Sequence, residues 1–108
     1  MASFDMYIRI YDWMLSSEKL NLPGKSALVY ALIFQMTVAK NGKGCYYAGL
    51  SQMGKKLNMT TGELNTIITK LRKANIITSG KKKIDGIDRT FYEANLELAR
   101  KMAISPDF

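Results

Sequence analysis

Lysine and arginine are the side chains of this sequence whose type and spacing point to a definite chemistry. Residues 50–83 hold eight basic residues against one acid, Glu63, whereas bases and acids cancel in the rest of the chain. About a third of the chain therefore carries the whole net charge of +7. Positive charge gathered in this way is typical of a surface that binds nucleic acid or another polyanion.

The most concentrated part of this charge is the run SGKKKIDGIDR, residues 79–89, in which three lysines precede Asp85 and Gly86. A short basic run is usually an exposed loop, and the lysines alone do not say more. Asp-Gly, however, is the strongest signal for a two-residue hairpin turn. The strand pairs would then be Ile84–Ile87, Lys83–Asp88 and Lys82–Arg89. Facing cations destabilise a hairpin unless a negative group lies nearby, so the run predicts a basic hairpin rather than a loop without regular structure.

Residues that could support catalysis or hold a metal are scarce. The chain has no histidine, which removes the commonest general base and zinc ligand. Cys45 is the single cysteine; it excludes an internal disulfide, indicates a reducing compartment, and is interpreted as a small buried apolar residue rather than a reactive thiol. The Gly-Lys-Gly at 42–44 lacks the Lys-Ser/Thr of a phosphate-binding loop. The sequence predicts no enzyme activity, metal or cofactor, and no small-molecule ligand is evident.

Length and hydropathy set the class of protein. A chain of 108 residues is large enough for one domain and one core. The longest apolar run, residues 27–39, is too short to cross a bilayer, which needs ~20 residues. The first residues lack the basic start of a secretory signal. We therefore expect a soluble cytoplasmic protein.

The first half of the chain predicts a helix that must be buried. Residues 25–40 have apolar side chains around almost the whole circumference, so this helix must be covered on more than one side. The second cover could be the N-terminal segment with Trp13, or a partner subunit in a homodimer. Apolar residues alternate between residues 6 and 10, which favours an extended, strand-like start over a helix running to Leu15. Residues 45–47 are a candidate for a short strand.

The second half of the chain predicts two helices and a hairpin. Residues 50–57 form a short amphipathic helix, and Asn58 and Met59 form a turn. Thr60 and Glu63 then have the spacing of a capping box, in which each residue bonds the other's backbone amide. The capped helix is expected to continue to Asn75. Its inward side chains are Leu64, Ile67, Ile68 and Leu71. The hairpin follows, and residues 96–102 could form a final short helix.

This order of elements, together with the residues at 8–15, 28–33, 49–53, 57–60 and 71–77, resembles the winged helix-turn-helix domain of bacterial, plasmid and phage proteins. That group includes replication initiators, replisome organisers and small regulators. The resemblance covers roughly residues 6–95 and implies an α+β, mainly α fold with a C-terminal β-hairpin wing. The single domain over 1–108 would consist of an N-terminal segment (1–24), a core helix (25–40), a helix-turn-helix (50–75), a wing (76–95) and a short tail (96–108).

The resemblance implies a recognition helix at residues 60–75 in the major groove and a wing along the DNA backbone or minor groove. The candidate DNA contacts are Lys55, Lys56, Thr60, Thr61, Asn65, Thr66, Thr69, Lys70, Arg72, Lys73, Lys81, Lys82, Lys83 and Arg89. Related domains often have a basic residue after the cap, whereas here Gly62 and Glu63 occupy that end. Asparagine is suited to adenine, so Asn65, Thr66 and Thr69 remain the candidates for reading bases.

The function expected is therefore binding of double-stranded DNA by a small transcriptional regulator, a homodimer, that acts by occupying its site. Because no second domain is expected after residue 108, the protein would act only by occupying its DNA site. Replication initiation or plasmid partition in a mobile element is an alternative role for the same DNA-binding protein. A different class of function is a protein–protein interaction module on the same fold, anchored by the apolar helix at 25–40.

Overall fold

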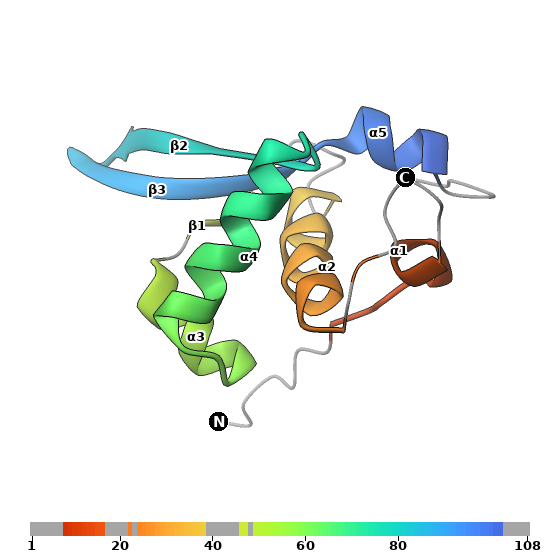
Figure 1. Cartoon of the computed structure of the whole chain (residues 1–108). Helices are drawn as coiled ribbons and strands as arrows, with labels where there is room; N and C mark the ends of the chain where they lie inside the picture. The colour runs from red at the N-terminus through yellow and green to blue at the C-terminus, as the bar shows by residue number, and fades with distance from the viewer. Residues whose placement is uncertain (1–7, 17–21, 23, 39–45, 48, 103–108) are drawn as a thin grey trace, which may run out of the picture.

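A computed structural model of the chain describes residues 8–16, 22, 24–38, 46–47 and 49–102, and it confirms the predicted α+β, mainly helical architecture with a hairpin (Figure 1). In chain order the elements are α1 (Asp12–Ser16), α2 (Gly24–Val38), β1 (Tyr46–Tyr47), α3 (Leu50–Leu57), α4 (Thr61–Lys73), β2 (Ile77–Ile84), β3 (Ile87–Ala94) and α5 (Leu96–Met102). Cys45 and the predicted last two residues of the core helix lie outside the described residues. No helix among the described residues is long and apolar enough to span a bilayer.

Helix α2 is the centre of the molecule, with α1 on one side and the α3–α4 pair on the other (Figure 1). Residues 29–34 are each at most 2% exposed. Met14 of α1, Leu64 of α4 and Tyr92 of β3 belong to the same buried cluster. The second side of α2 is thus covered by the N-terminal segment of its own chain, the first of the two predicted possibilities. Its apolar character needs no partner subunit.

The predicted strand-like start is wrong for the residues described, because residues 8–10 have no regular structure and α1 begins at Asp12. The backbone amide of Arg9 donates to Oε1 of Gln35 at 3.1 Å, on α2, rather than to a neighbouring strand. Tyr11 and Trp13 follow, with ring centroids 6.0 and 5.5 Å from Phe34. The alternation therefore belongs to a segment without regular structure that lies along α2.

The sheet has three antiparallel strands in the order β1-β3-β2. The predicted register is confirmed: Ile84 pairs with Ile87, Lys83 with Asp88 and Lys82 with Arg89. Asp85 and Gly86 form the turn with φ of 52° and 77°, and positive φ at both positions is what a type I′ turn requires. Tyr46 and Tyr47 are confirmed as a short strand opposite Tyr92 and Phe91.

Two polar side chains hold the root of the hairpin. Oγ1 of Thr37, buried in α2, donates to the Ile33 carbonyl at 2.8 Å and accepts from the Ala94 amide at 3.0 Å. Asn95 donates from its side chain to the Asn75 carbonyl at 2.9 Å and accepts from the Leu98 amide at 3.2 Å. The first residue ties β3 to the core helix, and the second ties the α4–β2 connection to the start of α5.

Candidate nucleic-acid interface

The α3–α4 pair meets at a tight turn built around Gly54. Helix α3 ends where predicted, at Leu57, and Asn58 follows in the left-handed conformation at φ 57°. A Cβ on Gly54 would lie 2.5 Å from the carbonyl oxygen of Met59, closer than real Cβ atoms approach any atom. Only glycine therefore lets the chain after α3 pass so near to it. The sequence signal for this role, a glycine inside an amphipathic helix, was not used in the prediction.

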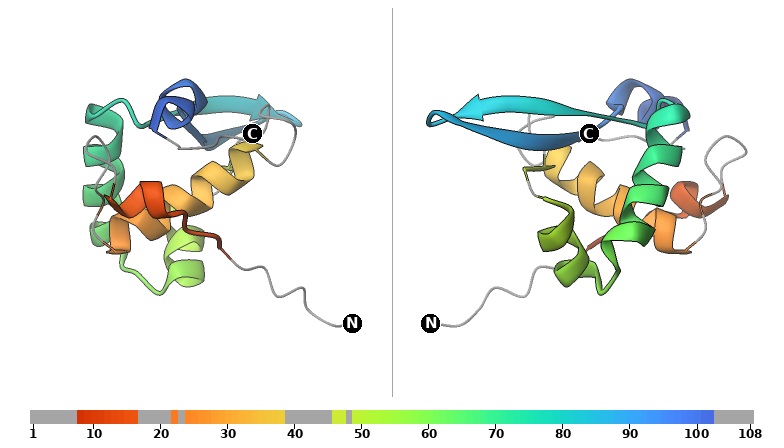
Figure 2. Two further views of the ribbon diagram at one scale, coloured as in Figure 1. Left: turned by 90° about the vertical axis from the view of Figure 1, so that its right-hand side faces the viewer. Right: turned by 60° about the vertical axis from the view of Figure 1, so that its left-hand side comes forward.

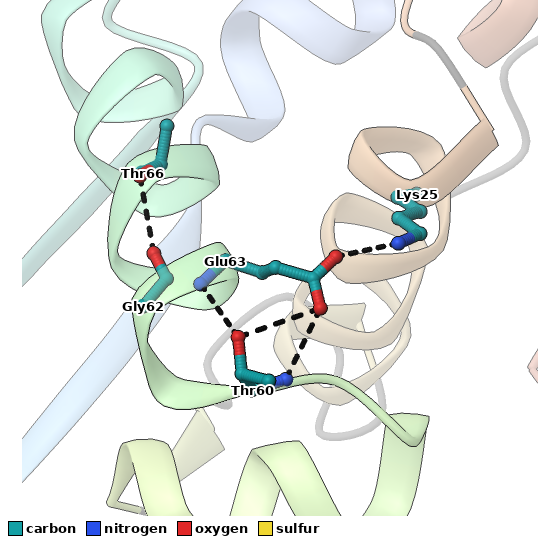
Figure 3. Close-up of polar contacts among 5 residues, drawn as sticks. All are labelled: Lys25, Thr60, Gly62, Glu63 and Thr66. Atoms are coloured by element: carbon teal, nitrogen blue, oxygen red, sulfur yellow. Dashed lines mark hydrogen bonds and ion pairs between the residues drawn. The ribbon is translucent and has the colours of Figure 1, made fainter.

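The predicted capping box at the start of α4 is confirmed (Figure 3). The Glu63 amide donates to Oγ1 of Thr60 at 3.1 Å, and the Thr60 amide donates to Oε1 of Glu63 at 3.3 Å. Oε2 of Glu63 pairs with Nζ of Lys25 at the beginning of α2. The hydrogen bond from Lys25, followed by that from the Thr60 backbone, holds the pKa of Glu63 below its ordinary value. Both carboxylate oxygens thus serve the fold, which leaves Glu63 poorly suited to contact bases.

Helix α4 buries Leu64, Ile68 and Leu71 as predicted, whereas Ile67 is half-buried. The predicted end at Asn75 is wrong by two residues, because α4 stops at Lys73. Asn75 takes the left-handed conformation at φ 61°, and the Ile76 amide donates back to the Leu71 carbonyl at 2.9 Å. This arrangement is a Schellman-type helix end, and it turns the chain sharply into the hairpin.

The exposed side of α4 has an uncharged middle and a cationic end. Thr61, Asn65 and Thr66 are exposed, and Thr69 is half-buried. The Thr66 hydroxyl donates to the Gly62 carbonyl at 3.1 Å, so its hydrogen is already engaged within the helix. The cations of the last turn are Lys70, Arg72 and Lys73. Among the predicted base readers, Asn65 is the one with an exposed amide side chain.

Arg72 has a second role that the sequence did not indicate. Its Nη1 donates to Oγ of Ser79 on β2 at 3.0 Å, which links the end of α4 to the hairpin. Burial raises the pKa of Tyr92, the strand partner of Ser79, and the nearby charge of Arg72 opposes that rise. Arg72 therefore helps to set the direction of the hairpin relative to α4, besides being an exposed cation.

The hairpin does not present its three lysines on one surface. Alternate residues of a strand point to opposite faces, and Ile77, Tyr92 and Ala94 are buried on the face that we call the inner face. Lys81 and Lys83 belong to this inner face by register. Lys82 and its partner Arg89 belong to the opposite, outer face. The three lysines of the predicted wing are thus divided between two faces.

The predicted contacts lie on three elements: α3, α4 with its cap residue, and the hairpin. All of them are exposed except the half-buried Thr69. Lys55 and Lys56 stand at the end of α3, beside the start of α4, and Lys55 lines a shallow hollow together with Thr60 and Thr61. The hairpin begins at the other end of α4 and projects past the side on which α3 lies (Figure 2). Cations therefore flank both ends of α4, and uncharged side chains lie between them.

Potential metal ligands do not gather in the part of the chain that the structure describes, where no three His, Cys, Asp or Glu side chains come together. No protein-family model matches the sequence, and no curated protein matches it. A solved structure described as the N-terminal domain of a DNA binding protein is similar in fold, with a TM-score of 0.62 and 13% identity over 94% of this chain and 91% of that chain. A likeness at this identity shows the fold that the two chains share.

Proposed function

We propose that this domain binds duplex DNA through α4 and the hairpin wing. The observation that carries the proposal is the charge around α4. Lys55 and Lys56 of α3 lie beside its start, three cations lie in its last turn, and exposed, uncharged Thr61 and Asn65 lie between them. A helix of 13 residues is ~20 Å long, and the major groove is ~12 Å wide. The two cationic ends can reach phosphates on either side of the groove, while the middle faces base edges.

The charge and position of each residue indicate whether it would contact phosphates or bases. Lys55, Lys56, Lys70 and Lys73 would neutralise phosphates, as would the inner-face lysines of the wing. Asn65 would read bases, since asparagine can form two hydrogen bonds with adenine. The solved structure of similar fold was described as part of a DNA binding protein, which is in line with this assignment.

The biological role that we propose is transcriptional regulation by occupancy of a duplex site. A reporter placed downstream of the domain's preferred sequence would test it, with repression by the wild type and its loss in Asn65→Ala as the expected results. An unchanged reporter signal would contradict the role in transcription and leave DNA binding itself intact. The interaction-module alternative loses the observation that favoured it, because α2 is buried within its own chain.

A titration of random duplex under increasing salt tests DNA binding. With about six phosphates contacted, raising salt from 50 to 200 mM should weaken binding by about a thousandfold. Lys55→Gln with Lys56→Gln should weaken binding to all sequences alike, whereas Asn65→Ala should alter the preference among sequences. Absence of binding at low salt would refute the proposal.

Selection of bound sequences from a random duplex pool tests the homodimer. Two half-sites about 34 Å apart would indicate a two-fold dimer on DNA, and a single short site would indicate a monomer. Light scattering of the free protein gives the independent check, against the chain mass of 12.2 kDa.

A further inference from the structure

The outer face of the wing carries side chains that α4 and the inner face do not use. In register order from the tip, this face holds Ile87, then Lys82 opposite Arg89, then a row formed by Gly80, Phe91 and Tyr47. Thr78 and Glu93 form the last row, nearest the body. Successive rows are ~7 Å apart, because two residues of a strand separate them. Cations and aromatic rings are thus immediate neighbours on one exposed surface.

Each face of the wing carries two cations and one acid, but only on the outer face do the two cations lie directly opposite each other. On the inner face Lys83 lies directly opposite Asp88, so one of its two cations has an acid as its strand partner. On the outer face Lys82 lies opposite Arg89, so two cations stand side by side, and the acid of that face, Glu93, is two rows away. Like charges directly opposite each other destabilise a hairpin, and an anionic ligand would relieve that repulsion.

The aromatic row places the half-buried ring of Phe91 beside the exposed ring of Tyr47. Phe91 leans over Gly80, and a Cβ on that glycine would come within 3.0 Å of the ring. The Lys82 ammonium lies 4.8 Å from the centre of the same ring, so it covers the ring, and a base that stacks there must displace it toward a phosphate. Tyr47, on the neighbouring strand in the same row, is 41% exposed. Ile87 at the tip is 57% exposed and extends the apolar part of the surface.

We propose that the outer face of the wing binds single-stranded nucleic acid, with bases stacked on Phe91 and Tyr47 and phosphates held by Lys82 and Arg89. A single strand exposes both phosphates and the flat faces of its bases, and base–aromatic stacking beside cations is how such strands are bound without regard to sequence. The bases of a duplex are stacked inside it and cannot reach these rings. An acidic peptide would form ion pairs with the cations, but its carboxylates would make no stacking contact with the aromatic row.

Fluorescence anisotropy with the full chain tests this proposal, using a labelled thymidine oligonucleotide and an abasic oligonucleotide with the same number of phosphates. The wild type should bind the thymidine strand about tenfold more tightly than the abasic strand, because stacking needs bases. Lys82→Gln with Arg89→Gln should weaken binding of the thymidine strand about tenfold. The matched control, Lys81→Gln with Lys83→Gln, removes the same charge from the inner face and should weaken it by about twofold or less.

A ring variant separates stacking from charge. Phe91→Leu keeps an apolar side chain over Gly80, and it should abolish the preference for thymidine over abasic strands while leaving abasic binding unchanged. If Phe91→Leu fails to fold, as judged by thermal unfolding, Tyr47→Leu gives the same test from the neighbouring strand. Equal binding of the thymidine and abasic strands, equal loss in the two double variants, or equally tight binding of an acidic peptide would each overturn the proposal. Duplex binding through α4 is measured separately, so either proposal can fail alone.

Discussion

Replacing Thr37 with valine should destabilise the protein although the two side chains have nearly the same shape. Thr37 is 1% exposed, and its hydroxyl is the acceptor that the described structure provides for the Ala94 amide, at 3.0 Å. The same hydroxyl donates to the Ile33 carbonyl at 2.8 Å. Valine would put a methyl group where the acceptor stands, at the point where β3 joins the core helix.

The size of the effect follows from the group that loses its partner. A buried amide without an acceptor costs about 1–3 kcal/mol. The Ile33 carbonyl loses only an additional bond, because a helix carbonyl already accepts from the amide four residues later. We expect Thr37→Val to lower the free energy of unfolding by about 2 kcal/mol, which corresponds to a fall in Tm of about 8 °C for a domain of this size.

Urea unfolding followed by circular dichroism measures this difference, and Thr37→Ser is the matched control. Serine keeps both hydrogen bonds and loses a buried methyl group, which costs about 1 kcal/mol. The serine variant should therefore be more stable than the valine variant, the reverse of the order expected from side-chain hydrophobicity. Valine equal to or more stable than serine would refute the role assigned to the hydroxyl.

Three further predictions concern single residues. Gly54→Ala should lower stability by about 3 kcal/mol or more, since a Cβ there would meet the Met59 carbonyl at 2.5 Å; thermal unfolding checks this, and a loss under about 1 kcal/mol would contradict it. Tyr30→Phe should leave stability unchanged or raise it by about 1 kcal/mol, because the buried Tyr30 hydroxyl lacks a hydrogen-bond partner in the described structure; a marked loss in urea unfolding would reveal a hidden partner. The lowered pKa of Glu63 adds stability that is present above its ordinary value near 4.5 and is lost as pH falls through the lower folded-state value. Glu63→Gln should therefore flatten the acid side of the curve of unfolding free energy against pH. Equal slopes for the variant and the wild type would argue against this role of Glu63.

Local signals in the sequence predicted the parts of the fold that depend on a few neighbouring residues. Asp85 and Gly86 predicted the hairpin register to the residue, and Thr60 with Glu63 predicted the cap of α4. In each case the determining atoms lie within four positions of one another. The exposed positions of the candidate DNA contacts also follow from local pattern, whereas their contacts with DNA remain predictions.

Contacts between distant parts of the chain could not be predicted in this way. Lys25 and Glu63 are 38 positions apart, and Thr37 and Ala94 are 57 apart. The alternation at the start of the chain fitted a strand. The neighbour of this segment is the helix α2, which the local pattern could not indicate. The assignment of wing residues to two faces, unlike these long-range contacts, could have been derived from the sequence. It follows from the predicted register and the two-residue period of a strand.

The place of β2 in the sheet gives its lysines a consequence that is independent of any ligand. β2 is the last strand in the order β1-β3-β2, so within the described residues its outer edge has unpaired amide and carbonyl groups. Such an edge can pair with the same edge of another molecule and start aggregation, and lysines are a common protection against it. Lys81, Lys82 and Lys83 place charge on both faces of this edge.

Replacing all three lysines with alanine would therefore do two things at once. It would remove cations, and it would leave an eight-residue edge strand with an uncharged central run, able to join strands from other molecules. Loss of DNA binding in such a variant could then arise from aggregation. Glutamine or glutamate at these positions keeps the edge polar, so variants of that kind separate the two effects. Protection of this edge is therefore by itself a sufficient role for a lysine at these positions, whether or not a ligand binds there.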